Sequence, residues 1–266
     1  MERRQYLRTA VGGAAGTLAL AGCLGSGDEN PNVKLSKPDL QTDPEDYPFP
    51  AWGQQIPSVT VPDALGGGTV TTTDYEKPLA LTFVFSNCQT ACPILTRALV
   101  AAQREAADGG WSDAVEFAEI TFDPARDTPE RLAEYADERS VDLDAGNWTF
   151  LRPESEARAK TVVQDEFGVF YEKIPPGEMS GGDSTATPDG SGTATATETA
   201  SETTEASGTE TDGTVDEDSA GYMFRHLSLI LLVNGDGYVE RTWRGSGGIE
   251  AAAAELPDAM DRLRTA

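Results

Sequence analysis

The sequence has 266 residues and a formal net charge of −25, with 45 Asp and Glu against 20 Lys and Arg. This balance excludes a protein that binds nucleic acid through its phosphates. It is typical of a protein kept soluble in very high salt, so we expect a halophilic host; an ordinary acidic surface is the alternative. The chain has only three cysteines (Cys23, Cys88 and Cys92) and one histidine (His226), which excludes a disulfide-stapled miniprotein and restricts any metal site.

Residues 1–23 are predicted to be a targeting segment. Arg3 and Arg4 fit a twin-arginine export signal, and the Ala-, Gly- and Leu-rich run that follows is too short and small-sided to span a membrane. Cys23 ends this run in a pattern similar to a lipobox, so we predict a lipid anchor there; a plain cleaved signal peptide is the alternative. The protein is therefore expected at the extracytoplasmic face of the cell membrane, with residues 24–50 as a flexible linker.

Residues 51–266 are predicted to form one domain in which strands and helices alternate. The apolar run 79–85 is expected to be a buried strand that leads into a helix. Thr128 is a natural N-cap with Pro129 at the first helical position, which predicts the start of another helix. The expected strands are 59–61, 69–73, 79–85, 114–122, 148–151, 169–172, 226–233 and 238–243. The expected helices are 92–107, 129–139, 154–167 and 249–263.

This order of elements predicts an α/β fold in which a central mixed β-sheet is flanked by helices and preceded by a β-hairpin. Residues 175–221 differ from the rest, because they contain eleven acidic residues, no Lys or Arg, and almost nothing large and apolar. Such a segment cannot bury enough surface to offset an ordering entropy of roughly 1–2 kcal/mol per residue. We predict a disordered acidic insertion in a surface loop, where the many Ser and Thr would permit O-glycosylation.

Cys88 and Cys92 lie where the strand 79–85 is followed by the next helix. Unpaired N–H groups and the helix dipole favour thiolates at a helix N-terminus. The C-x-x-x-C spacing puts the two sulfurs about one helical turn apart, near enough to form a disulfide or to share one metal ion. An inert buried disulfide is the alternative interpretation.

His226 is expected at the start of an apolar strand, and a core or surface imidazole without a ligand is the alternative. Together with Cys88 and Cys92 it would give three protein ligands. Structural zinc takes four ligands, whereas copper(I) takes two or three soft ligands, and copper(II) could complete its site with water or a backbone atom. The ligand count therefore predicts copper over structural zinc.

Asp123 and Asp127 flank a turn that precedes a predicted helix. One interpretation is helix capping and turn chemistry. The other is an acidic rim near the metal or a contact for a docking partner. Tyr222, Phe224 and Trp243 are predicted to serve packing rather than function.

Four motifs, taken in order, resemble those of the SCO/SenC family: Cys88-x-x-x-Cys92-Pro93, Asp123-Pro124-x-Arg126-Asp127-Thr128-Pro129, Phe167-Gly168-Val169-x-Tyr171-x-Lys173, and a lone His226 followed by an apolar strand and an Asn-Gly-Asp-Gly turn. The similarity covers roughly residues 51–264, apart from the insertion. It implies a thioredoxin-like fold, copper bound by the two cysteines and the histidine, and a role in building the binuclear copper centre of cytochrome c oxidase. The partner would be the copper-centre subunit of that oxidase, and the protein itself is expected to be a monomer.

The sequence departs from this family in three places: Gln89 stands where Pro is frequent, Arg225 stands where Asp often precedes the histidine, and the acidic insertion is extra. Some members act as thiol reductants. A second hypothesis is therefore an enzyme, a thiol–disulfide oxidoreductase in which Cys88 attacks and Cys92 resolves the mixed disulfide. A thiol peroxidase would need an activating arginine, and Arg97 is a poor candidate.

Overall fold

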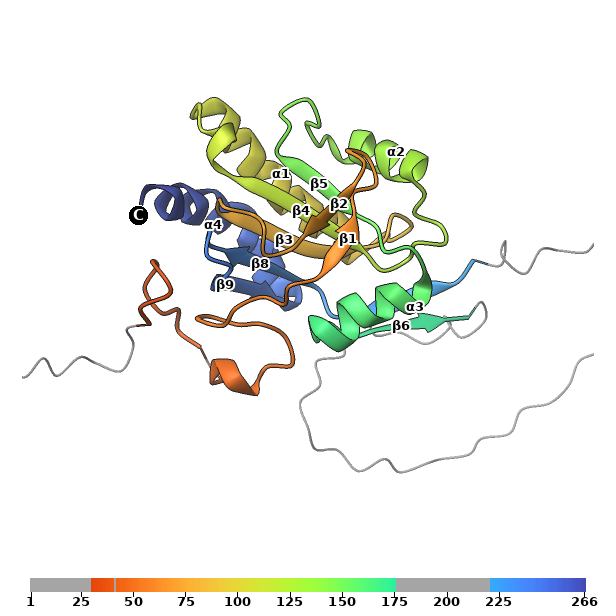
Figure 1. The fold of residues 1–266 in the computed structure, drawn as a ribbon, viewed down its shortest axis with the longest axis horizontal. Helices are drawn as coiled ribbons and strands as arrows, with labels where there is room; N and C mark the ends of the chain where they lie inside the picture. The colour runs from red at the N-terminus through yellow and green to blue at the C-terminus, as the bar shows by residue number, and fades with distance from the viewer. Residues whose placement is uncertain (1–29, 41, 176–220) are drawn as a thin grey trace, which may run out of the picture.

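A computed structural model describes residues 30–40, 42–175 and 221–266. Its centre is a five-stranded mixed sheet in the order β5-β4-β3-β8-β9, with helices on both faces (Figure 1). The strands are β3 (Leu79–Val84), β4 (Glu116–Thr121), β5 (Trp148–Leu151), β8 (Leu229–Val233) and β9 (Val239–Arg244). This architecture confirms the predicted α/β, thioredoxin-like fold. The targeting segment with Cys23, and nearly all of the predicted insertion, lie outside the described residues.

The register of the sheet brings the loops after β3 and β4 to one edge. β3 runs parallel to β4 with Val84 opposite Thr121, and β4 runs parallel to β5. β8 is antiparallel to β3, and β9 is antiparallel to β8. Because the carboxyl ends of β3 and β4 meet, the loop with Cys88 and the turn that begins at Asp123 lie at the same end of the sheet, where sites of α/β proteins are usually found.

Helices cover both faces of the sheet, as predicted. α1 (Ala91–Asp108), α2 (Pro129–Arg139) and α4 (Gly245–Thr265) pack on one face. The other face is covered by α3 (Glu156–Ala159), its continuation η3 (Lys160–Glu166), and the hairpin of β1 (Thr60–Pro62) and β2 (Thr69–Thr71). The structure also has two short 3₁₀ turns, η1 (Pro44–Asp46) before β1 and η2 (Ser112–Ala114) between α1 and β4. Every residue of β3 is buried, which is typical of a central strand packed on both faces.

The predicted start of α2 is confirmed in detail. Pro129 is the first helical residue, and the Thr128 side chain accepts a hydrogen bond of 3.2 Å from the Arg131 N–H. The predicted helix 154–167 is different, because its second half, η3, is a π-helix in which Phe167 N–H donates to the Val162 carbonyl. This wider turn buries the neighbouring residues Val162 and Val163 together.

The prediction of one strand over residues 226–233 is wrong. β7 (Met223–His226) pairs antiparallel with β6 (Tyr171–Ile174) in a separate two-stranded ribbon, and β8 begins three residues after His226. His226 therefore ends β7, with Tyr171 opposite it. β6 and β7 lie on opposite sides of the predicted insertion. The apolar pattern after His226 is local, so it could not reveal that His226 pairs with Tyr171.

The part of the expected linker that the structure describes packs on the domain. The buried carboxylate of Glu240 accepts hydrogen bonds from the backbone N–H groups of Lys34 (2.8 Å) and Leu35 (2.8 Å). Phe49 is buried in the core on the α3 side of the sheet. Residues 53–56 then pair with residues 237–239, which covers the sheet edge where β9 begins.

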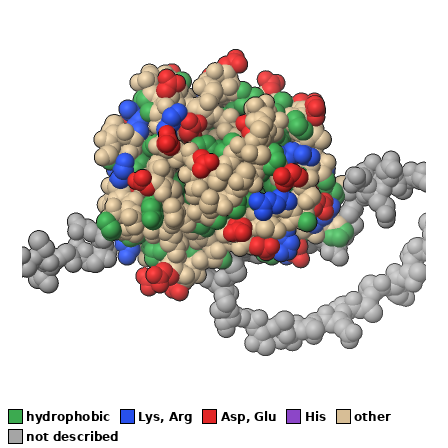
Figure 2. Space-filling model, in the orientation of Figure 1, with side chains coloured by type: hydrophobic (Ala, Val, Ile, Leu, Met, Phe, Trp, Pro, Cys, Tyr) green, Lys and Arg blue, Asp and Glu red, His purple; other side chains and the backbone are tan. Residues whose placement is uncertain are grey.

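Two features of the exterior follow from the described residues. Figure 2 shows Asp and Glu side chains spread over the viewed face with Lys and Arg between them, so this face has no continuous basic patch of the kind that nucleic acid needs. Within the described ranges, none of the helices has the length and apolar character needed to cross a membrane.

Candidate metal centre

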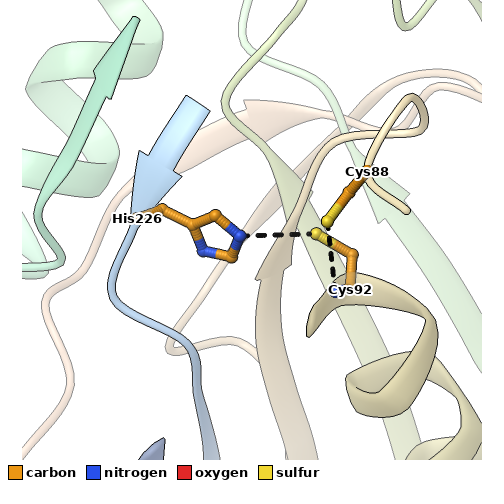
Figure 3. Close-up of side chains that lie close together, drawn as sticks. All are labelled: Cys88, Cys92 and His226. Atoms are coloured by element: carbon orange, nitrogen blue, oxygen red, sulfur yellow. Dashed lines mark hydrogen bonds between the residues drawn. The ribbon is translucent and has the colours of Figure 1, made fainter. Parts of the chain in front are cut away.

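Three side chains from distant parts of the sequence meet at the carboxyl end of β3. One ligand atom each of Cys88, Cys92 and His226 lies within 4.8 Å of the others (Figure 3). In the described part of the chain, this is the one group of three or more His, Cys, Asp and Glu side chains arranged to hold a metal ion. The predicted site residues are therefore brought together by the fold.

The two cysteines are positioned by the change from strand to helix. Cys88 lies in the loop after β3, where its N–H donates to the Phe85 carbonyl (3.1 Å). Cys92 lies in the first turn of α1, and its N–H donates to Cys88 Sγ (3.3 Å). Thr90, at the N-cap position, makes no capping bond with its side chain. The sulfur of Cys88 thus takes the part of an N-cap acceptor, which stabilises its thiolate.

The two thiols differ strongly in acidity. A hydrogen bond from the Cys92 side chain is the largest cause that lowers the pKa of Cys88 to about 3. Burial raises the pKa of Cys92 well above its usual value, and the neighbouring Cys88 raises it further. Both cysteines are free thiols in this structure. The pair therefore consists of a ready thiolate and a thiol that keeps its proton.

His226 presents one nitrogen to the sulfurs. Its Nε2 lies 3.6 Å from Cys92 Sγ, and its Nδ1 lies 3.3 Å from the Leu227 carbonyl oxygen. A carbonyl oxygen can only accept, so we place the proton on Nδ1 and the lone pair on Nε2. The imidazole packs against the rings of Phe85 and Phe122, with centroids 5.9 and 5.1 Å away. An apolar wall of this kind restricts water at a metal site.

Two departures from the family pattern lie outside this centre. Arg225 is exposed, and it forms an ion pair of 3.5 Å with Glu172 on the paired strand. Since successive side chains of a strand point to opposite faces, Arg225 faces away from the imidazole of His226. Gln89 is also exposed, in the loop between the two cysteines.

Asp123 and Asp127 are fully buried, so neither forms an exposed acidic rim. Asp127 accepts hydrogen bonds from the backbone and hydroxyl of Ser86. Asp123 accepts from the Tyr222 hydroxyl (2.7 Å). The helix cap is made by Thr128 instead. The sequence analysis missed these buried roles, because the spacing of two carboxylates does not reveal whether they face solvent.

The sequence analysis also missed Glu119, a charged residue in the middle of an otherwise apolar strand. Glu119 is fully buried, accepts a hydrogen bond of 2.7 Å from Thr96, and has a second carboxylate oxygen without a partner. Burial raises its pKa to about 8. The sequence did contain a signal for it, because a carboxylic acid in the middle of an apolar strand is unusual. Arg97, the candidate for a peroxidase, is exposed on α1, whereas Cys92 and Thr96 are buried.

The donor set fits one soft metal ion. Two thiolate sulfurs on one ion, each at about 2.3 Å, lie no more than about 4.6 Å apart, and an imidazole nitrogen binds at about 2.0–2.1 Å. Donors that already lie within 4.8 Å of one another need only small side-chain movements to reach such distances. Two sulfurs and one nitrogen suit copper(I), which accepts three soft ligands.

Comparison with known proteins gives a family-model match over part of the chain and a shared fold. The SCO1/SenC family model matches residues 65–188. A SCO1/SenC family lipoprotein from Bacillus anthracis is 19% identical with a TM-score of 0.52, over 80% of this chain and 95% of its own. Arabidopsis thaliana ScoI, solved with copper bound, is 19% identical with a TM-score of 0.50, over 79% and 99%. BsSco is 17% identical with a TM-score of 0.50, over 83% and 98%. The sequence matches no curated protein.

Proposed function

Because the SCO1/SenC family model matches residues 65–188 and two cysteines and a histidine meet at one place, we propose that this chain binds copper through Cys88, Cys92 and His226 and delivers the ion to another protein. The observation that carries this proposal is the convergence of two sulfurs and one imidazole nitrogen at one end of the sheet. The copper bound to the Arabidopsis neighbour agrees with this choice of metal. Here copper is a cargo that the protein takes up and releases.

The chemistry of the three ligands suits uptake followed by release. Cys88 meets the ion as a thiolate, because its pKa is lowered to about 3 by the hydrogen bonds that it accepts. Cys92 must give up a proton on binding, because its pKa is raised by burial. The hydrogen bond between Nδ1 of His226 and the Leu227 carbonyl keeps Nε2 free to bind. With three protein ligands, the ion can accept a further thiolate from a partner.

The exposure of the three ligands indicates the side from which a partner would approach. Cys88 is 2% exposed and Cys92 is fully buried, whereas His226 is half-buried at the end of β7. A partner ligand would therefore reach the ion beside His226. In this proposal His226 leaves first, and the two sulfurs follow by stepwise ligand exchange.

We further propose that the recipient is the copper-centre subunit of a cytochrome c oxidase. BsSco is described as a member of the Sco family of cytochrome c oxidase assembly proteins. The predicted export signal and the predicted lipid anchor at Cys23 would hold the protein at the extracytoplasmic face of the membrane, beside a membrane-bound oxidase. The protein would act there as a monomer.

A copper titration of the reduced protein tests the proposal. We expect one copper(I) ion per chain, and an affinity loss of more than about 100-fold for His226→Ala, because even the loss of an outer-shell partner costs about 10–100-fold. Arg225→Ala is the matched control, since its side chain points away from the site. Binding that is absent in the wild type, or unchanged in His226→Ala, would contradict the proposal.

A thiol–disulfide oxidoreductase is the second candidate, and the unequal acidity of the two thiols favours it. The Cys88 thiolate would attack a disulfide of the oxidase subunit and form a mixed disulfide. Cys92 would then lose its proton and displace the substrate sulfur. The substrate gains two thiols, and Cys88 and Cys92 end as a disulfide.

The two candidates make different demands on His226. As a reductase, the protein should keep most of its rate with a model disulfide after His226→Ala, and lose it after Cys88→Ser. As a copper carrier, it should lose tight copper binding after either change. A reductase rate in His226→Ala that falls as far as in Cys88→Ser would exclude the two-thiol mechanism.

A further inference from the structure

The turn between β4 and α2 contacts both parts of the metal centre, the loop that contains Cys88 and the segment that leads to His226. Its carboxylates, Asp123 and Asp127, are four residues apart and fully buried. Burying a carboxylate is costly unless hydrogen bonds and charges compensate. Their partners therefore show what each carboxylate holds in place.

Asp127 holds the half of the centre that contains the cysteines. Its two oxygens accept the Ser86 N–H at 3.1 and 3.2 Å and the Ser86 hydroxyl at 2.5 Å, and one of them also accepts from the Thr121 hydroxyl. Ser86 precedes Cys88 by two residues, and Arg131 donates to the same hydroxyl from α2 (3.2 Å). The start of the cysteine loop is thus fixed to the end of β4 and to α2.

Asp123 holds the half that contains the histidine. One oxygen accepts the Tyr222 hydroxyl at 2.7 Å, and the other accepts Nε of Arg126 at 2.5 Å. Arg126 also donates to the Tyr222 carbonyl (2.9 Å). The Tyr222 ring lies between two cations, the Arg126 guanidinium at 3.6 Å and Lys173 Nζ at 3.8 Å. Tyr222 is only 5% exposed, and it precedes His226 by four residues.

Among the described residues, the Asp123 carboxylate accepts no hydrogen bond from the cysteine loop. The Asp127 carboxylate likewise accepts none from β7. Each carboxylate therefore acts on one half of the centre. A packing role alone would not need this division, since apolar side chains could fill the same space at lower cost.

We propose that Asp123 and Asp127 are separate positioning residues, Asp123 for His226 through Tyr222, and Asp127 for Cys88 through Ser86. This inference deepens the proposed copper function, on which its metal-dependent part rests. Neither carboxylate binds the ion. Each sets where one kind of ligand stands before copper arrives.

The first experiment needs no metal. His226 is the only histidine in the chain, so its imidazole NMR signals need no assignment. We expect Tyr222→Phe, which removes only the hydroxyl bonded to Asp123, to shift or broaden these signals while the thiols react with a small disulfide reagent at the wild-type rate. Ser86→Ala should do the reverse. Tyr238→Phe, at the other end of the sheet, is the matched control. Equal effects of both variants on both readouts would overturn the proposal.

The second experiment measures copper affinity in two backgrounds. Tyr222→Phe should weaken binding about 10-fold in the wild type, within the range for outer-shell partners, and less than about twofold in His226→Ala. Ser86→Ala should weaken binding in both backgrounds. An equal loss from Tyr222→Phe in both would mean a general structural role and would overturn the inference. If the wild type takes up no copper, the proposed function fails, and the metal-free experiment still decides the positioning.

Discussion

Cys92 Sγ lies 3.6 Å from His226 Nε2, although 134 positions separate the two residues in the sequence. Two independent pieces of structure create this contact. The first turn of α1 places Cys92, and the pairing of β7 with β6 places His226. The site therefore depends on a ribbon that is not part of the central sheet, and it should be more sensitive to changes in that ribbon than to changes at the far end of the sheet.

The acidity of Cys88 should depend on its neighbour in α1. The hydrogen bond from the Cys92 side chain is the main reason for the lowered pKa of Cys88. Cys92→Ala removes this donor, so we expect the pKa of Cys88 to rise by at least about one unit, which corresponds to about 1.4 kcal/mol. Cys92→Ser keeps an O–H donor and should give a smaller rise. Thiolate absorbance followed against pH, in metal-free protein with Cys23 replaced by serine, measures both.

The buried carboxyl of Glu119 should make the protein less stable as the pH rises. Its pKa is raised to about 8 in the folded protein from an ordinary value of 4.5. Between these two values the unfolded chain loses the proton while the folded protein keeps it, so the free energy of unfolding falls by up to about 1.4 kcal/mol per pH unit. Above about pH 8 this contribution levels off.

Comparison with Glu119→Gln isolates that contribution, because other titrating groups are common to both proteins. Urea unfolding at several pH values between 5 and 8 should show the variant gaining stability relative to the wild type as the pH rises. A constant difference across this range would show that the Glu119 carboxyl titrates near its ordinary pKa in the folded protein.

The helix cap of α2 should contribute measurable stability. Thr128 accepts a hydrogen bond from the Arg131 N–H, and Thr128→Ala leaves that donor without its partner. Loss of such a cap costs about 0.5–2 kcal/mol. Ser155 makes the same kind of bond to Arg158 at the start of α3, at 3.1 Å. Ser155→Ala is thus a matched comparison, and denaturant unfolding measures both. A change below about 0.3 kcal/mol at Thr128 would contradict a capping role.

The sequence predicted those parts of the fold that depend on local patterns. The apolar run before Cys88 became β3, and the Thr128–Pro129 pair marked the start of α2 within one residue. Both signals lie within a few residues of the feature that they predict. The same is true of the Cys88–Cys92 spacing, which placed both sulfurs at a helix N-terminus.

What the sequence did not predict depends on contacts between distant segments. The break after His226 arises because β7 pairs with β6 instead of continuing into β8. The burial of Asp123 depends on Tyr222, 99 positions away. Glu240, which holds the backbone of Lys34 and Leu35, carried no signal at all, because its partners are backbone groups about 205 positions away.

Gly168 should be required for the packing of the N-terminal segment on the domain. It adopts φ +66, and a Cβ there would lie 1.5 Å from the Pro48 carbonyl oxygen. Gly168→Ala must therefore pay for a left-handed backbone, about 1–2 kcal/mol, and also displace Pro48 and the buried Phe49 next to it. We expect a loss of more than about 3 kcal/mol in the free energy of unfolding, or earlier proteolysis near residue 48.

Gly110→Ala separates these two costs. Gly110 has nearly the same backbone, φ +69, but a Cβ there would meet nothing within 4 Å. Gly110→Ala should lower the free energy of unfolding only by the cost of the left-handed backbone, about 1–2 kcal/mol. The difference between the two variants therefore measures the contact with Pro48. Because η3 leads directly into Gly168 and β6 follows it, a displaced Pro48 should also disturb the ribbon that carries His226. Equal losses in Gly168→Ala and Gly110→Ala, with unchanged imidazole signals, would show that the N-terminal segment is not held at this point.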